Sequence, residues 1–211
     1  MTEADSAPRT RNPSATKARL LEAATEEFAA HGIAGARIDR IEAAARANRS
    51  LIYSYFTNKD GLFDAVMDAA VARVLDEVPF TPEDLPGYVG QLFDFLGGNP
   101  NLLRLAMWHR LERAGSGRET AGLSDSHRLN VASVTEARAE SRSASGLSPE
   151  DLYVFTLALA SAWAPASPHV PAALATRDLA AHRAAIVEAT RRITAPHAAS
   201  PLLEPSTTVN K

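Results

Sequence analysis

The chain has 211 residues, no cysteine and a formal net charge of −3. The length allows one ordinary domain or two small ones, and the 45% of hydrophobic residues suffices for a core. The missing cysteine excludes disulfides and thiolate metal sites, and no apolar run is long enough to span a membrane. With a polar N-terminus unlike a signal peptide, the sequence predicts a cytoplasmic protein without a membrane partner.

Positive charge is concentrated in one short segment. Residues 36–59 carry five basic side chains against two acidic ones, so this segment is +3 while the rest of the chain is −6. A small basic patch on an acidic body suits a protein that touches DNA through one face. It disfavours a protein that coats nucleic acid.

Helical apolar spacing recurs along the first third of the chain, and no segment has the alternation of a strand. His31-Gly32 ends the first predicted helix, and Asn58 caps the fourth. Pro79 and Pro82 stop the fourth helix. The predicted helices cover residues 14–30, 38–45, 49–56 and 59–77.

The second and third of these helices are short and joined by a tight turn, which predicts a helix-turn-helix. In that motif the second short helix enters the major groove. Arg49 and Ser50 begin this helix, after Asn48 as its N-cap. Tyr53 and Tyr55 either pack or donate hydroxyls to phosphates.

Five more helices are predicted in the rest of the chain, at 82–96, 100–114, 119–143, 149–163 and 177–194. Ser148 is the N-cap of the fourth of these, followed by Pro149 and an acidic first turn. Residues 165–171 are a proline-rich loop. The predicted fold is all-α, with a flexible arm at 1–13, a helix-turn-helix domain at 14–60, a helical regulatory domain at 61–195 and a flexible tail at 196–211.

The N-terminal residues resemble the TetR family of bacterial regulators over residues 17–66. The resemblance lies in Ile41-Glu-Ala-Ala-Ala, Asn48-Arg-Ser-Leu-Ile-Tyr-Ser-Tyr-Phe and Asn58-Lys-Asp-Gly-Leu-Phe, preceded by Leu20-Leu-Glu-Ala-Ala and Phe28-Ala-Ala-His-Gly. It implies about nine helices, DNA binding by the first three and the start of the fourth, and a C-terminal domain that holds a ligand cavity and dimerises through its last two helices.

Two positions depart from the family pattern. Arg46 stands in the turn where the family has glycine, and a positive φ there costs an arginine near 1 kcal/mol or more. Ala36 and Arg37 stand where threonine is usual, so the cap of the second helix is lost while Arg37 keeps a possible phosphate contact.

The predicted DNA-contacting side chains all come from this motif and its flanks. Asn48 is a helix cap first, and Arg49 and Lys59 have the alternative of being ordinary solvated charges. The full set is Arg37, Arg46, Asn48, Arg49, Ser50, Tyr53, Tyr55 and Lys59.

The C-terminal half offers a predicted ligand pocket. Residues 102–111 are apolar on both faces, which predicts a centrally buried helix. Large rings, a thioether and nearby polar groups suit an apolar small-molecule site, although the same side chains could fill a dry core. The predicted wall is Arg104, Met107, Trp108, His109, Phe155 and Trp163.

The last two predicted helices carry apolar residues at helical spacing, and two copies would form a four-helix bundle. The resulting two-fold symmetry predicts a pseudo-palindromic operator. The predicted interface is Leu152, Phe155, Leu159, Leu179, Ile186, Val187 and Ile193.

The sequence therefore predicts a homodimeric repressor that a small-molecule effector releases from double-stranded DNA. The alternatives are a non-specific DNA-organising protein and a helical carrier or enzyme with a vestigial DNA domain. The chain lacks a glycine-rich phosphate loop, HExxH and GxSxG, and its histidines are scattered. Asp64 and Asp68 have the spacing of a metal pair, but a solvated face explains them. No catalytic residue, metal or cofactor is predicted.

Overall fold

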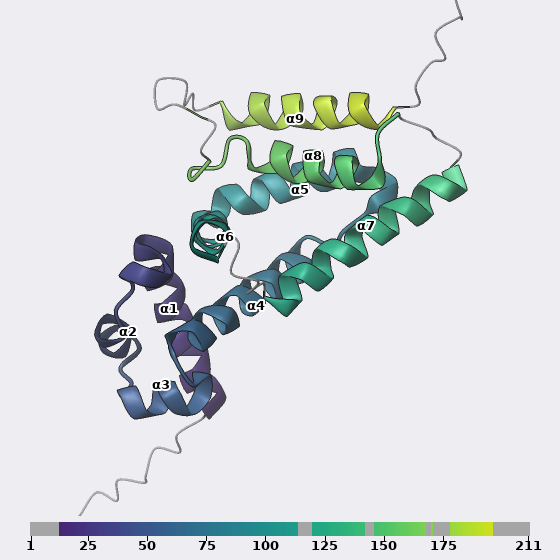
Figure 1. Ribbon diagram of the computed structural model, residues 1–211. Coiled ribbons are helices and arrows are strands. Elements are labelled where there is room, and N and C mark those ends of the chain that lie inside the picture. The colour runs from purple at the N-terminus through teal and green to yellow at the C-terminus, as the bar shows by residue number, and fades with distance from the viewer. Residues whose placement is uncertain (1–12, 114–119, 142–145, 168–169, 171–177, 196–211) are drawn as a thin grey trace, which may run out of the picture.

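The computed structural model describes residues 13–113, 120–141, 146–167, 170 and 178–195, and these form an all-α fold. Helices α1 (Pro13–Gly35) to α3 (Arg49–Phe56) form the DNA-binding end that the sequence predicts. They lie at the opposite end of the molecule from α9 (Leu179–Thr194), which makes an outer layer (Figure 1). The predicted arm and tail lie outside the described residues, apart from Pro13. The helices are α1 (Pro13–Gly35), α2 (Ile38–Ala45), α3 (Arg49–Phe56), α4 (Lys59–Glu77), a short 3₁₀ turn η1 (Pro82–Asp84), α5 (Leu85–Gly98), α6 (Pro100–Arg113), α7 (Ala121–Ser141), α8 (Pro149–Ser161) and α9 (Leu179–Thr194).

Helix α1 runs further than the predicted 14–30 and contains a break. Gly32 has φ 70° and ψ −177°, so the chain turns there and resumes one helical turn that ends at Gly35. A Cβ on Gly32 would overlap the Glu112 carboxylate and come within 2.9 Å of the Trp108 ring. Glycine is therefore required both for the backbone conformation and for the close approach of α6.

Local signals determine the ends of α3 and α4. The Asn48 side chain accepts a hydrogen bond from Leu51 N, and the Asn58 side chain accepts one from Gly61 N, each at 2.8 Å. A Cβ at Gly61 would overlap the carbonyl oxygen of Phe56, so glycine allows α4 to start close against the end of α3. Both asparagine caps predicted from the sequence are confirmed.

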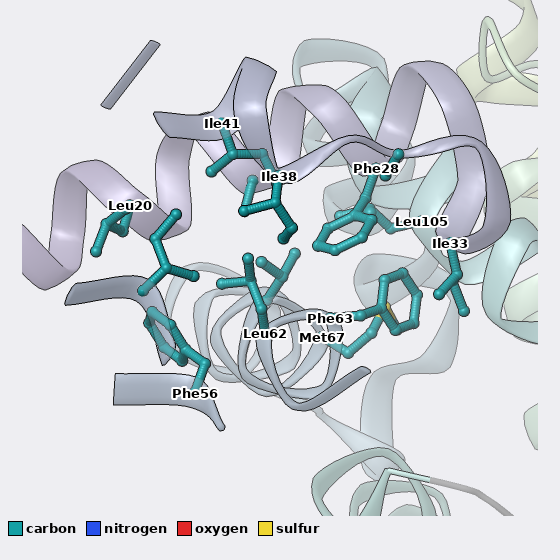
Figure 2. Close-up of a cluster of buried hydrophobic side chains, with 14 of the residues drawn as sticks. Leu20, Phe28, Ile33, Ile38, Ile41, Phe56, Leu62, Phe63, Met67 and Leu105 are labelled. Carbon is teal, nitrogen blue, oxygen red and sulfur yellow. The ribbon is translucent and has the colours of Figure 1, made fainter. Parts of the chain in front are cut away.

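The core of the N-terminal end extends past residue 60 (Figure 2). Leu62, Phe63 and Met67 from α4 contribute to it, and Leu105 from α6 completes it with a fully buried side chain. The Phe28 and Phe63 rings meet edge to face at 5.1 Å between centroids. The predicted boundary at residue 60 thus crosses one continuous hydrophobic core.

The C-terminal half is built around α5, which packs against α8 and α9. Its core joins side chains of α5, such as Val89 and Phe93, with Ala160 of α8 and Ile186 of α9. Ser148 and Asp151 form a capping box at the start of α8, so the predicted cap is confirmed. None of the helices in the described residues is both long and apolar enough to cross a membrane.

Helix α6 is not the centrally buried helix that its composition predicts. Only Leu105, His109 and Arg113 are buried along it, and the Leu111 side chain is 70% exposed. The reason is that α6 packs mainly along α1, Leu102 and Leu103 are only partly buried against the C-terminal core, and a further side that includes Leu111 stays at the surface.

Candidate nucleic-acid interface

Helix α3 presents a polar face to solvent and buries its apolar face. Ile52 and Phe56 lie in the core, whereas Arg49 and Ser50 are exposed and Tyr53 is 41% exposed. This division places the first residues of α3 where a recognition helix needs side chains that can reach base edges. The exposed aromatic ring of Tyr53 and its hydroxyl are available to a phosphate or a sugar.

In the turn before α3, Arg46 adopts the left-handed backbone conformation that favours glycine at this position. Arg46 has φ 50° and ψ 46°, in the left-handed region, and its side chain is exposed. Arg37 stands at the N-cap of α2 without a side-chain cap bond, as its sequence position predicts. Both side chains are exposed, one at the start of α2 and one at its end.

Two of the exposed arginines have a carboxylate partner within the chain. Arg49 Nε donates to Glu42 Oε1 at 2.9 Å, and Arg37 Nη2 donates to Asp39 Oδ2 at 2.7 Å. The hydrogen bond from Arg37 lowers the pKa of the Asp39 carboxyl. Such exposed pairs contribute about 0–1 kcal/mol, so exchanging the carboxylate for a DNA phosphate costs little.

Lys59 and Tyr55, also predicted to contact phosphate, are held by the protein itself. Lys59 Nζ donates to the carbonyl oxygens of Ala34 and Ala36, each at 3.2 Å. Tyr55 packs partly against the core, and its hydroxyl donates to Pro13 O at 3.4 Å. Asn48 is occupied as a helix cap. Among the side chains predicted to contact DNA, the exposed ones are Arg37, Arg46, Asn48, Arg49, Ser50 and Tyr53.

Glu27 is a structural carboxylate that the sequence reasoning missed. Its side chain is only 9% exposed, and its oxygens accept from Arg40 Nε at 2.8 and 3.0 Å and from Arg37 N at 2.8 Å. Burial alone would raise the Glu27 pKa, but the hydrogen bonds from Arg40 and Arg37 outweigh it, so the pKa is lowered. An acidic residue inside the apolar stripe of α1 is the signal that could have identified it.

The six residues predicted to line a ligand pocket lie in separate places. Arg104 Nε and Trp108 Nε1 donate to the Ala29 carbonyl of α1, at 2.7 and 3.2 Å. His109 is buried and stacks on Phe63, with 6.3 Å between ring centroids. Met107 is half-buried on α6, Phe155 is exposed on α8, and Trp163, just after α8, packs against the C-terminal core.

A surface pocket of about 340 Å³ lies beside the contact between α1 and α6. Of the six predicted residues, Arg104 lines it. The complete lining is Glu26, Ala30, Pro100, Asn101, Arg104, Pro165 and Ala166. The lining combines alanines and prolines with three polar side chains, and most of it is exposed, unlike the enclosed apolar site that the sequence predicts.

Buried hydroxyl groups gather between α5, α7 and α8, where the sequence reasoning named no site. Tyr88 and Tyr153 are both buried, and Asn130 Nδ2 donates to the Tyr153 hydroxyl at 3.3 Å. Phe80 lies edge-on to both rings. Desolvation is the main reason why the pKa of each phenol is raised, so both stay neutral and able to donate a hydrogen bond.

The predicted dimer residues divide into three groups by exposure. Phe155 is 40% exposed and Leu179 is 58% exposed, and Val154 beside Phe155 is exposed as well. Leu152 and Ile186, by contrast, are buried inside the chain, because their faces of α8 and α9 turn toward its own cores. Leu159, Val187 and Ile193 are half-buried. The exposed group offers the most apolar surface to a second copy.

Two family models match the chain. Residues 20–66 match the model described as bacterial regulatory proteins, tetR family. Residues 84–192 match the model described as tetracyclin repressor-like, C-terminal domain. The first match covers the helix-turn-helix and the start of α4, and the second spans α5 to α9 almost completely.

Curated relatives include two transcriptional repressors. The chain is 51% identical over 102 residues to the HTH-type transcriptional repressor SCO4008 of Streptomyces coelicolor, covering 48% of this chain and 53% of that protein. It is 25% identical over 115 residues to the HTH-type transcriptional repressor NicS of Pseudomonas putida, covering 51% and 54%. The matches thus span about half the length of these relatives.

Solved structures resemble the whole chain more completely. The transcriptional regulator SCO4942 of Streptomyces coelicolor superposes with a TM-score of 0.73 at 33% identity, covering 84% of this chain and 97% of that one. FadR of Bacillus subtilis, solved in complex with stearoyl-CoA, has a TM-score of 0.60 at 18% identity, covering 82% and 96%. The second likeness is one of fold alone.

Proposed function

Because the chain belongs to the TetR family of bacterial regulatory proteins, we propose that it is a homodimeric transcriptional repressor. Two recognition helices bind a pseudo-palindromic operator, and a small-molecule effector in the C-terminal half releases it. The SCO4008 and NicS relatives, both transcriptional repressors, support repression over activation.

The surface of α3 carries this proposal. Arg49, Ser50 and Tyr53 face solvent on a short helix whose other side is fixed by Ile52 and Phe56 in the core. The helix can therefore enter a major groove without rearranging the core behind it. The net charge of +3 on residues 36–59 supplies a local attraction for phosphate.

Dimerisation rests on the exposed apolar residues of the last two helices. Val154, Phe155 and Leu179 are large side chains at the end of the molecule opposite α3. Covering them with the same surface of a second copy gives a two-fold dimer. The two recognition helices then lie on the same side of the dimer and match an operator with inverted half-sites.

Effector binding is proposed for the buried polar groups between α5, α7 and α8. The Tyr88 and Tyr153 hydroxyls and the Asn130 amide lie among apolar side chains, as the orienting groups of small-molecule sites do. The stearoyl-CoA complex of FadR supports the capacity of this fold to hold an effector. An effector acts only through a difference in its affinity for the two conformations.

Selection of bound sequences from a random DNA pool tests the proposal. We expect an inverted repeat, and we expect Arg49→Ala and Tyr53→Ala to weaken binding to it by about 1–3 kcal/mol each. Arg128→Ala is the matched control, since Arg128 is an exposed arginine on α7, paired with Asp125. Its operator affinity should equal that of the unaltered chain.

The alternatives predict different results. A DNA-organising protein would bind random and selected DNA equally at the same salt concentration. A carrier or enzyme with a vestigial DNA domain would show no change in DNA affinity when Arg49 or Tyr53 is replaced. Either result would contradict a sequence-specific repressor.

A further inference from the structure

The break in α1 exposes backbone groups that an unbroken helix would satisfy. At Gly32 the chain leaves the helix, so the preceding carbonyls and the following N–H groups lose their ordinary i to i+4 partners. Ala29 O lies on the first side of the break, and Ile33 N and Ala34 N lie on the second. A neighbouring helix has to supply their hydrogen bonds if the break is to keep one geometry.

Helix α6 supplies partners for both sides of the break. Arg104 and Trp108 donate to Ala29 O at 2.7 and 3.2 Å. Glu112 accepts from Ile33 N at 3.0 Å with one carboxylate oxygen and from Ala34 N at 2.7 Å with the other. We refer to these three side chains and the break as the α6 clasp.

The spacing within the clasp makes it rigid. Arg104, Trp108 and Glu112 are four residues apart, so they stand on one stripe of α6 and move with it. The missing side chain at Gly32 lets this stripe approach, because a Cβ there would overlap Glu112 and the Trp108 ring. A carboxylate that receives two backbone N–H groups forms charge-assisted hydrogen bonds with a defined direction.

We propose that Glu112 is a positioning residue for DNA binding: through the clasp it fixes the orientation of the α1–α3 head relative to α6, without touching DNA. Lys59 connects the same region to α3 and α4, since it donates to the carbonyls of Ala34 and Ala36 directly after the break. A shift of α6 is therefore transmitted to the start of α2 through the single helical turn that follows Gly32, which Glu112 holds. The link to DNA affinity rests on the proposed function.

One further residue of α6 holds the head through α4. Arg113, with a buried side chain, pairs with Asp64 and lies 3.5 Å from Asp60, both on the first turns of α4. Its guanidinium also lies over the Phe63 ring, 4.9 Å from the centroid. With α4 held in this way, loss of the clasp leaves α1 free to tilt about α4 and does not detach the head.

The absence of cysteine from the chain makes the orientation directly measurable. Spin labels on Ala43→Cys in α2 and Leu129→Cys in α7, both exposed positions, report the distance between head and C-terminal half within one protomer. Labelled chains diluted with unlabelled ones keep the distance intramolecular. This readout requires neither DNA nor an effector.

Glu112→Ala is the main variant, and Glu112→Gln keeps the shape while removing the charge. For Glu112→Ala we expect faster amide hydrogen exchange at Ile33 and Ala34, a broadened or shifted label distance, and operator affinity about tenfold lower, as expected when charged hydrogen bonds are lost. The Gln side chain can accept from only one of the two N–H groups, so its effects should be intermediate. Glu136→Ala, at an exposed position of α7, is the matched control.

The outcomes separate the positioning role from a merely structural one. Faster exchange at Ile33 and Ala34, with distance and affinity unchanged, would mean that Glu112 only caps the end of α1, and the proposal would be rejected. An altered distance in a chain that binds no specific DNA would instead contradict the proposed function and leave the role in orientation intact.

Discussion

Two residues of the helix-turn-helix adopt a backbone conformation that their side chains disfavour. Arg46 closes α2 in the left-handed region, and Thr57 has φ 64° and ψ −52° between α3 and α4. Such positions cost about 1–3 kcal/mol each and persist where the surroundings hold them. The Asn58 cap and the close approach at Gly61 hold the second turn, whereas the Arg46 side chain is exposed and its turn depends on backbone hydrogen bonds.

Arg46→Gly should therefore stabilise the protein. We expect the free energy of unfolding to rise by about 1 kcal/mol, because glycine adopts the left-handed region at little cost. Urea denaturation monitored by circular dichroism measures the change. Arg46→Ala keeps the Cβ and removes the charge, so an equal gain in that variant would show that charge and not backbone conformation is responsible.

Helix caps could be predicted from the sequence, whereas contacts between residues far apart in the chain could not. Asn48 and Ser148 cap the helices that the sequence assigns to them, because a cap depends on residues three positions away. Lys59 is predicted to contact phosphate, and nothing local in the sequence indicates that its ammonium also bonds to carbonyls 23 and 25 residues earlier in the chain. Glu112 likewise gains its role from α1, almost 80 residues away.

At the scale of elements, the joint between α1 and α2 depends on Glu27. Its carboxylate receives the first free N–H of α2, from Arg37, and the guanidinium of Arg40. Arg37 is the N-cap residue of α2 and makes no side-chain cap bond, so the contact with Glu27 ties the start of α2 to α1. The departure from the family pattern at the start of α2 is thus compensated from α1.

Glu27→Gln should destabilise the protein at neutral pH by about 1–3 kcal/mol, since charged hydrogen bonds are lost and the Arg40 guanidinium keeps no carboxylate there. The lowered pKa of Glu27 means that its contribution is present above the ordinary glutamate pKa and is lost as pH falls through the lowered value. The stability difference between the two chains should therefore shrink in acid. Urea titrations between pH 7 and pH 3 measure it, with Glu22→Gln, an exposed residue of α1, as control.

The prediction for α6 shows why helix position is harder to infer than helix existence. Residues 100–113 are helical as the pattern indicates, but the leucines on both faces did not show how fully each would be buried, from Leu105 with no exposure to Leu111 at 70%. Which face is covered depends on α1, whose Gly32 admits α6 at close range. The predicted pocket residues on α6 contact α1 and α4 for the same reason.

For the whole molecule, the proposed dimer would have its heads far from its interface, because α8 and α9 lie at the end opposite α3. The interface reasoning from sequence selects apolar residues on α8 and α9 but could not separate the exposed face of each helix from the buried one. Leu152 and Ile186 have the same helical spacing as their exposed neighbours and point into the protomer.

Phe155→Glu combined with Leu179→Glu should produce monomers at micromolar concentration, because burying two carboxylates at an apolar interface is strongly unfavourable. Sedimentation velocity measures the change, and operator affinity should fall because one head alone contacts one half-site. Leu129→Glu introduces the same charge at an exposed leucine of α7 and should leave the dimer intact. A monomeric unaltered chain would remove the basis for an inverted-repeat operator.

Leu105 has a consequence for the engineering of hybrid sensors. It is a residue of α6, yet it completes the core of the DNA-binding head (Figure 2). A head excised near residue 66 would have a cavity where the Leu105 side chain lies. The break at Gly32 would also lose the hydrogen bonds that α6 provides. Chimeras that graft this head onto another regulator's sensing half should therefore carry the α1-facing stripe of α6 with it, so that the transplantable unit is discontinuous in sequence.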